Sequence, residues 1–357
     1  MKRDNFSRPP LKIALMGLGR AMLNEHFPVF ANHPALFNVV AACDLIKERR
    51  DIVAKTFPKC KMFRIFEDML DEHDIDLVII GLPAVERKDY VLSSIKRGFW
   101  TLIESPISLS HDEAQLIRGA ATKSKNRVAV IERSLFEPDF LLTKQMMSDS
   151  RLGRIHKIVI REEEYVKRCD WQAVKRTGGG AAFCQIPNLM MKALHLLPSQ
   201  PVQMWSDSKR ITSLGDVEDY VHVNLVTRTQ VTADIEYNPG MLKENRGNSF
   251  EIHGEKGVFC IQPGKTTGVM RYIDPAFRFP HTRSSVRTPP MNAIQSPIPV
   301  CSDEISLPVG THYGRSAFWK AIYDTVRIAK PLPYDLNDSI KIIKYVQLIR
   351  KSSPYGR

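Results

Sequence analysis

The stretch that decides the fold is KIALMGLGRAM, residues 12–22, in which an apolar run passes directly into Gly17 and Gly19. The residues that follow have helical spacing as far as Ala31. A strand, a glycine turn and a helix in this order are typical of dinucleotide sites, because the backbone can then approach a pyrophosphate at the helix N-terminus. Met22 stands where a third small residue is usual, so an ordinary strand-to-helix turn stays open as the alternative.

A carboxylate follows the next apolar run at the spacing that such a site requires. NVVAAC, residues 38–43, is followed by Asp44, which lies 22 residues beyond Met22, close to the spacing of about 20 residues that is usual for such a site. Asp44 can accept both ribose hydroxyls and repel a 2′-phosphate, so we expect NAD(H) in preference to NADP(H). Lys47, Arg49 and Arg50 follow closely and form either a solvated helix face or a phosphate contact. The cofactor-binding residues predicted from these two motifs are Gly17, Gly19, Arg20, Ala21 and Asp44.

Apolar runs and amphipathic segments alternate up to Glu132. The further apolar runs are LVII, WTLIE and VAVIE, and the amphipathic segments span residues 20–31, 46–57, 86–97 and 111–122. Apolar strands that alternate with helices indicate a parallel sheet covered on both faces. We therefore predict a doubly wound α/β (Rossmann) domain of about six strands over residues 1–132.

The pattern changes after Pro138. A helix at 140–147, the strand RIHKIVIREEEY and an apolar helix after three glycines (178–180) precede several strand-like segments without helices between them. Two helices, 315–329 and 337–351, close the chain. Adjacent strands of this kind predict an α+β domain with an antiparallel or mixed sheet over residues 133–357. Residues 277–307 show no periodicity and are predicted to be a long loop or arm.

Composition narrows the class of protein. The 357 residues carry 43% hydrophobic and 25% charged residues, which is typical of a globular protein of two domains. The net charge of +12 is spread along the chain, so we expect anionic small ligands rather than nucleic acid. Six scattered cysteines form no zinc motif, no apolar run is long enough to span a membrane, and the N-terminus lacks a secretory pattern. We predict a cytoplasmic protein without a structural metal or a membrane partner.

Several further motifs resemble those of the Gfo/Idh/MocA family of sugar and polyol oxidoreductases. They are GLGRAMLNEHFP, AACD, FEDMLDEHDIDLVIIGLP, DYVLSSIKRGFWTLIESPISLS, the triple glycine before an apolar helix, and the closing helix pair. The resemblance implies a C-terminal domain with a large open sheet, and a homodimer or homotetramer formed through that sheet. It also implies cofactor contacts from Leu82, Pro83, Glu104 and Ser105, and from Arg87 at a position where His is common.

The chain departs from the family at the positions that carry its chemistry. Relatives have a Lys in a Glu-Lys-Pro motif, which here reads Glu104-Ser105-Pro106. Relatives also carry Asp, His and Asp on the helix after the glycines, where this chain has Cys184, Asn188 and Met191. Hydride transfer to or from a carbinol needs a proton donor or acceptor, and neither an amide nor a thioether can be one.

Other polar residues are therefore candidates for the missing role. The catalytic candidates are Ser105, Cys184, Asn188, Lys175 and Tyr165. A Cys activated by Lys175 and Arg176 is a nucleophile, whereas a Cys on an apolar helix is ordinarily a buried hydrophobe. Arg133 can bind an acidic ligand or pair with Glu132, and His195 is expected to be structural. Residues 162–164, three glutamates in a row at the end of a strand, are interpreted as solvent-facing charge, with contact to the site as the alternative.

Two functions from different classes follow. The first is an NAD(P)-dependent oxidoreductase with a rebuilt catalytic site that acts on a sugar-like or polyol substrate. The second is a catalytically silent NAD(H)-binding protein that senses a ligand or supports a partner enzyme, because loss of several catalytic groups removes most of a rate enhancement. Non-redox chemistry through a transient keto intermediate is a third interpretation.

Overall fold

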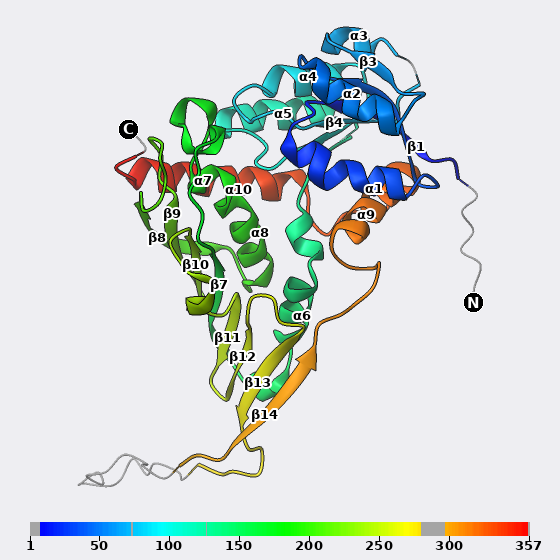
Figure 1. The fold of residues 1–357 in the computed structure, drawn as a ribbon. Coiled ribbons are helices and arrows are strands. Elements are labelled where there is room, and N and C mark those ends of the chain that lie inside the picture. Colours follow the sequence, from blue (N-terminus) through cyan, green and yellow to red (C-terminus); the bar gives the residue numbers. More distant parts are fainter. Residues whose placement is uncertain (1–7, 73, 126, 280–296, 356–357) are drawn as a thin grey trace.

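The first sheet has six strands, which are all parallel and wind in two directions from the centre (Figure 1). The computed structural model describes residues 8–72, 74–125, 127–279 and 297–355. The strands, in the order β3-β2-β1-β4-β5-β6, are β1 (Leu11–Met16), β2 (Phe37–Cys43), β3 (Lys61–Phe63), β4 (Leu77–Ile80), β5 (Trp100–Ile103) and β6 (Val128–Val130). The predicted doubly wound sheet is confirmed. Its switch point lies between β1 and β4, where such sheets bind ligands.

Helices cover both faces of this sheet. They are a π-helix (Met22–His26) that continues into α1 (Phe27–Asn32), then α2 (Lys47–Thr56), α3 (Phe66–Leu70), α4 (Lys88–Lys96) and α5 (His111–Lys123). Leu15 of β1 belongs to one apolar core with Phe30 of α1. Its neighbour Met16 belongs to a second core with Ile95 of α4 and Ile117 of α5. Alternate side chains of one strand thus pack against the helices on opposite faces of the sheet, as in any sheet buried on both sides.

The second sheet has eight strands and is mixed. In spatial order β14-β13-β12-β11-β7-β10-β9-β8, only β7 and β10 are parallel neighbours. The strands are β7 (Ile155–Glu163), β8 (Pro201–Lys209), β9 (Tyr220–Thr227), β10 (Thr232–Asn238), β11 (Phe250–Gly254), β12 (Gly257–Ile261), β13 (Thr267–Ile273) and β14 (Val300–Ser306). The predicted α+β domain with a large mixed sheet is confirmed.

The predicted loop at 277–307 is wrong at its C-terminal end. Residues Val300–Ser306 form β14, which pairs with β13 along its whole length. None of the residues in β14 is fully buried, so the strand lacks the apolar alternation by which strands are recognised. The middle of the predicted loop, residues 280–296, lies outside the described residues.

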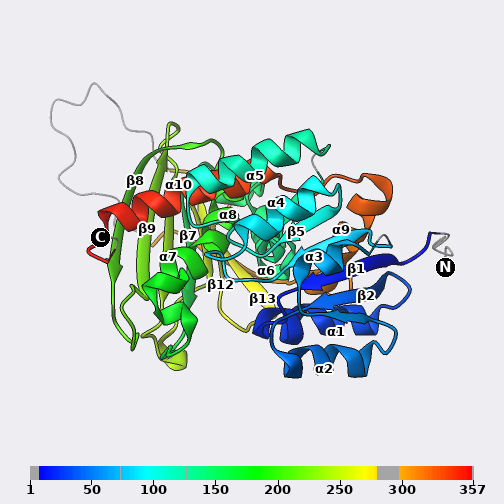
Figure 2. The same ribbon diagram turned by 90° about the horizontal axis from the view of Figure 1, so that it is seen from above.

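Five helices lie between or beside the two sheets, within the part of the chain that the structure describes. They are α6 (Pro138–Met146), α7 (Ala181–Cys184), α8 (Ile186–Leu196), α9 (Gly314–Ile328) and α10 (Leu336–Ser352). Figure 2 shows α10 running from the second sheet alongside α5. Ile343 of α10 packs in the core below β4 and α5, and Trp319 of α9 packs in the core with α1. The C-terminal helices therefore fix the first sheet relative to the second.

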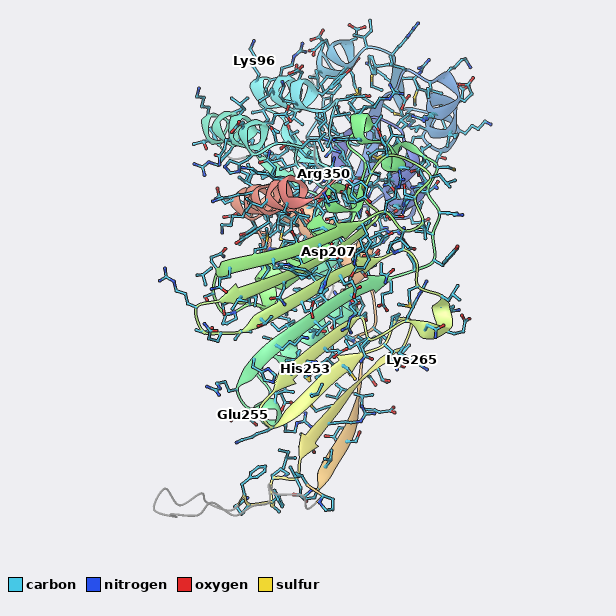
Figure 3. The ribbon with its side chains drawn as sticks, turned by 90° about the vertical axis from the view of Figure 1, so that its left-hand side faces the viewer. Lys96, Asp207, His253, Glu255, Lys265 and Arg350 are labelled. Carbon is cyan, nitrogen blue, oxygen red and sulfur yellow. The ribbon has the colours of Figure 1, made fainter. Side chains whose placement is uncertain are left out.

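The second sheet has one apolar and one polar face. Its inner face packs α8 into a large core, whereas the outer face, turned toward the viewer in Figure 3, carries polar side chains. Lys157 Nζ lies 3.1 Å from Asp234 Oδ2, and His222 pairs with the same carboxylate from the neighbouring strand. Trp205 on β8 packs edge-on against His222 and is 56% exposed. Cross-strand pairs of this kind stabilise a sheet face that no helix covers.

Candidate active site

One pocket of about 1280 Å³ lies at the carboxyl ends of the first sheet's strands and extends to α7 and α8. Ligands bind at this edge in doubly wound folds. The sequence-predicted residues that line the pocket are Gly17, Gly19, Ala21, Asp44, Leu82, Pro83, Arg87, Glu104, Ser105, Cys184 and Asn188. The structure therefore brings most of the predicted cofactor and substrate residues to one cavity.

The glycine turn after β1 has the shape that a pyrophosphate requires. Gly17 has φ +81°, and a Cβ there would lie 2.9 Å from Leu82 Cδ2. A Cβ on Gly19 would meet no atom within 4 Å, so the backbone there borders open space. Met22, in place of a third small residue, is buried, and its Cε lies 3.0 Å from the position of a Cβ on Gly81. The chain is helical from Arg20 and forms a π-helix over Met22–His26, and the turn fits a dinucleotide phosphate group.

Asp44 organises the end of the pocket beyond the glycine turn. Its Oδ2 accepts a hydrogen bond from the amide of Leu18 (2.7 Å) and its Oδ1 accepts one from the amide of Ile46 (2.8 Å). The residue is only 6% exposed, yet it lines the pocket. Each carboxylate oxygen has a further lone pair for a ribose hydroxyl. Arg49, 3.5 Å from Oδ2, and Arg64 line the same end.

The three basic residues after Asp44 have different partners. Lys47 pairs with Asp51 on the surface of α2 (2.8 Å), as a solvated helix face would. Arg50 donates to the carbonyl oxygen of Asp44. Arg49 is the one of the three that lines the pocket. Only Arg49 therefore retains the alternative role as a phosphate contact.

Arg87 fixes the loops after β4 and β5. Its guanidinium donates to the carbonyl oxygens of Leu82 (2.9 Å) and Pro106 (2.6 Å), and also to that of Glu104. Burial lowers its pKa to about 10. His26 contacts the Glu104 carboxylate at 2.5 Å, and although burial acts to raise it, the pKa of Glu104 is lowered by His26 and Arg87. Both predicted residues line the pocket while holding its wall in place.

Ser105 and Glu132 meet at the adjacent ends of β5 and β6. Ser105 Oγ donates to Glu132 Oε1 at 3.3 Å. Glu132 is 1% exposed, and burial raises its pKa to about 8. Arg133 pairs with Glu25 of the π-helix, so the alternative that Arg133 neutralises Glu132 is wrong. Glu132 is therefore a buried carboxyl group without a cationic partner among the described residues.

The opposite wall consists of α7 and the start of α8. Cys184, Asn188 and Lys192 follow one another at intervals of four residues and all line the pocket, whereas Met191 is fully buried in the core. Burial raises the pKa of Cys184 to about 12, so its sulfur is a thiol at neutral pH. The thiol is then a weak nucleophile, and the interpretation of Cys184 as a reactive thiolate finds no support in its surroundings.

The triple glycine positions this wall. Gly180 has φ +106°, and a Cβ on Gly179 would lie 2.4 Å from the carbonyl oxygen of Gln172. Arg350 of α10 donates to Glu218, which is fully buried, at 2.9 Å, and to the carbonyl of Gly179 at 3.3 Å. The glycines thus let the chain pass close to a buried ion pair, which in turn ties α7 to α10.

Lys192, Glu162 and Glu137 are among the pocket residues that the sequence did not predict as site candidates. Lys192 continues the four-residue spacing of Cys184 and Asn188, and this spacing was the available signal. Glu162 lies on β7 with the same parity as the buried Ile158 and Ile160 and lines the pocket. Its side chain is exposed there, so it is solvent-facing, as predicted, and also reaches the site. Glu137 precedes α6 and lines the pocket as well. Burial raises the pKa of both Glu137 and Glu162, and the charge of Lys192 opposes that rise.

Three predicted residues do not line the pocket. Arg20 is 65% exposed and its guanidinium lies 3.6 Å from Asp170. Tyr165 is 56% exposed. Lys175 lies in a short 3₁₀ helix, where its backbone amide donates to Asp216 Oδ1 at 2.7 Å. These three residues therefore lie outside the set that lines the pocket.

His195 hydrogen-bonds with the carbonyls of Met191 (3.0 Å) and Pro333 (3.3 Å), as expected of a structural residue. Within the described residues there is no cluster of His, Cys, Asp and Glu that could hold a metal ion. Of the helices in that part of the chain, none is both long and apolar enough to cross a membrane. The six cysteines are all free thiols.

The chain matches one family along most of its length. Residues 11–132 match the model of an oxidoreductase family with an NAD-binding Rossmann fold, and residues 140–260 match the Gfo/Idh/MocA C-terminal domain. The protein therefore belongs to the Gfo/Idh/MocA family of oxidoreductases, whose N-terminal domain is an NAD-binding Rossmann fold.

Individual relatives are distant. An uncharacterised oxidoreductase of Schizosaccharomyces pombe is 24% identical over 61% of this chain and 60% of its own length, so the match spans less than two thirds of that relative. An NADP⁺-dependent scyllo-inositol 2-dehydrogenase of Bacillus subtilis is 20% identical over 70% of this chain and 68% of its own. The structure of an aldose-aldose oxidoreductase from Caulobacter crescentus superposes with a TM-score of 0.77 at 16% identity, covering 98% of both chains. That likeness shows the shared fold.

Proposed function

We propose that this protein is an NAD(H)-dependent oxidoreductase that acts on a sugar-like or cyclic polyol substrate. The observation that carries the proposal is one continuous pocket. It has the glycine turn and Asp44 at one end, the polar wall of Asn188 and Lys192 at the other, and Ser105 between them. A nicotinamide at Ser105 would lie next to a substrate held by the polar wall, which is the arrangement that hydride transfer needs.

The polar wall suits a substrate with several hydroxyl groups. Asn188 offers a donor and an acceptor, Lys192 offers donors, and the carboxyl groups of Glu137 and Glu162 offer acceptors. A polyol with neighbouring hydroxyls can satisfy such a set, whereas an apolar ligand would leave it unpaired. The scyllo-inositol dehydrogenase among the relatives supports a cyclic polyol or its ketone.

Asp44 supports NAD(H) over NADP(H), since its carboxylate would repel a 2′-phosphate. Arg49 and Arg64 at the same end of the pocket are the features that favour the phosphate. Titration of the protein with NADH and with NADPH tests the preference. We expect tighter binding of NADH, and a smaller difference in Asp44→Ala. Equal or tighter binding of NADPH to the native protein would contradict it.

The alternative function is a catalytically silent NAD(H)-binding protein that senses a ligand or supports a partner. The observation that favours it is the residue set of Ser105, Cys184 and Asn188 in place of Lys, Asp and His. In that case NADH would bind without being oxidised by any carbonyl compound.

Turnover separates the two functions. Purified protein is mixed with NADH and a panel of keto-inositols and keto-sugars, and NADH absorbance is followed. The oxidoreductase proposal expects slow oxidation with at least one member. No oxidation across the panel, combined with activity created by Ser105→Lys, Cys184→Asp and Asn188→His together, would establish the silent alternative.

We also propose a homodimer or homotetramer formed through the outer face of the second sheet, a domain boundary after residue 132, and a cytoplasmic location without nucleic-acid or membrane partners. The exposed Trp205 and the polar pairs on that face support the assembly. Light scattering of the native protein and of Trp205→Glu tests it. We expect an oligomer that the substitution weakens, and a native monomer would contradict the assembly.

A further inference from the structure

Ser105 and Glu132 form a pair that links the pocket to a buried acid. They follow neighbouring parallel strands, β5 and β6, so both side chains emerge at the same edge of the sheet. Ser105 lines the pocket, while Glu132 lies behind it and is almost fully buried. The only side chain that hydrogen-bonds to Glu132 within the described residues is Ser105, and Oε2 of Glu132 has no partner there.

The groups around Glu132 favour its protonated form. Burial is the main cause, and the negative charges of Glu104 after β5 and Asp338 of α10 add to it, whereas the hydrogen bond from Ser105 acts in the opposite direction and lowers the pKa. The buried Tyr334, from the segment before α10, also interacts with Glu132. The nearest cations are engaged elsewhere, since Arg133 pairs with Glu25 and His26 pairs with Glu104. With burial as the main cause, the pKa of Glu132 is about 8.

The pKa values of Glu104 and Glu132 are therefore shifted in opposite directions. His26 and Arg87 lower the pKa of Glu104, whereas the pKa of Glu132 is raised. Two carboxyl groups whose environments separate their pKa values are a usual sign of an acid or base assignment. Of the two, only Glu132 contacts a hydroxyl group that reaches the pocket.

We propose that Glu132 is the general acid of this site and that Ser105 relays its proton to the substrate. The inference rests on the proposed oxidoreductase function. In the reductive direction the substrate carbonyl carbon accepts a hydride from the reduced nicotinamide. The hydroxyl of Ser105, which donates to Glu132 in the structure, first turns so that it donates to the carbonyl oxygen and accepts from the protonated carboxyl group. The carbonyl oxygen then takes the hydroxyl proton of Ser105, Ser105 takes the proton of Glu132, and the resulting carboxylate is reprotonated from solvent. Oxidation of an alcohol runs through the same groups in reverse.

The pairing with Glu132 also explains why position 105 is a serine rather than a lysine. A lysine at position 105 would place a cation beside Glu132 and hold it as a carboxylate, which is not an acid. A serine leaves the carboxyl protonated and still connects it to the pocket by a hydroxyl that both donates and accepts. Ser105 and Glu132 together thus replace a cationic proton donor by a neutral one.

Titration of the protein alone tests the acid directly. The infrared carbonyl band of protonated carboxyl groups is followed against pH in the native protein and in Glu132→Gln. We expect a band that disappears with a midpoint near pH 8 in the native protein, is missing in Glu132→Gln and shifts to lower pH in Ser105→Lys. The matched control Glu255→Gln, on the far end of the second sheet (Figure 3), should keep the band. A Glu132 that titrates in the ordinary glutamate range would overturn the inference and leave the oxidoreductase function standing.

Single-turnover oxidation of NADH tests the relay. Glu132→Gln and Ser105→Ala should each slow it about 100-fold, and the double variant should be no slower than either, because the two residues act as a unit. A native enzyme whose turnover is unchanged in both variants would refute the relay alone. Absence of turnover in the native protein with NADH bound would remove the function and the relay with it, while the band near pH 8 would still report the buried acid.

Discussion

The two walls of the pocket differ in what their side chains do. On the wall of the first sheet, Asp44 and Arg87 form most of their hydrogen bonds with backbone groups, and so hold the loops in place. On the wall of α7 and α8, Asn188 and Lys192 project into the pocket. The first wall provides a shape that any dinucleotide-binding sheet needs. The second carries Cys184 and Asn188, and these residues, together with Ser105 on the first wall, stand where the family resemblance places Asp, His and Lys.

The comparison predicts that the second wall depends on one buried ion pair. Arg350→Ala removes the partner of Glu218 and leaves a buried carboxylate beside the triple glycine, so the free energy of unfolding should fall by about 3–5 kcal/mol. Urea denaturation measures the loss. Arg154→Ala, which breaks an exposed pair with Glu255, is the matched control and should leave the midpoint unchanged. Equal midpoints for both variants would show that the ion pair does not hold the wall.

A second prediction concerns stability against pH. Between pH 4.5 and about 8 the unfolded chain has lost the Glu132 proton while the folded protein keeps it, so stability should fall as pH rises through that window. Glu132→Gln lacks this proton, and its fall should be smaller by an amount on the order of 3 kcal/mol. Chemical denaturation at pH 5 and pH 9 measures the difference. Parallel pH profiles for the two proteins would contradict a buried neutral acid.

The first wall should depend on backbone shape. Gly17→Ala places a Cβ against Leu82 at a positive φ, which costs about 1–3 kcal/mol and should weaken NADH binding about 5- to 150-fold. Gly98→Ala, also at positive φ but with open space around its Cβ and away from the pocket, is the control for backbone strain. Binding curves from fluorescence titration give both affinities. If both variants bind NADH equally well, Gly17 has no part in the site.

The smallest effect is expected at Cys184. Its raised pKa keeps it a thiol, so alkylation by iodoacetamide at neutral pH should be much slower than at Cys169, which is exposed. Mass spectrometry after timed labelling distinguishes the two residues. Rapid labelling of Cys184 would revive the interpretation of this residue as a nucleophile on the second wall.

The sequence predicted the first wall better than the second for a physical reason. Short sequence segments predict the glycine turn, Asp44 and the buried strands, because each of these features depends on the conformation and burial of neighbouring residues. Two elements without strong apolar patterning, β3 and β14, carried no such signal. The position of the site was predicted correctly although these two strands were not.

The relations that place the remaining pocket residues, on either wall, are long-range. Glu162 reaches the pocket because β7 packs under α8, and Lys192 because α8 continues the line of Asn188. The pairing of Ser105 with Glu132 depends on the adjacency of β5 and β6, and the raised pKa depends on burial by α10. None of these relations is contained in a single motif, so the sequence named Ser105 and Glu132 separately and did not connect them.

The most direct test of the account is rapid mixing of NADH-loaded protein with a keto-inositol while NADH absorbance is recorded across pH. The account predicts that the rate of oxidation is highest below about pH 8, falls above it as Glu132 loses its proton, and is about 100-fold lower and independent of pH in Glu132→Gln. Bound NADH that is never oxidised by any keto-polyol, at any pH, would contradict the central claim that this pocket is the active site of an oxidoreductase.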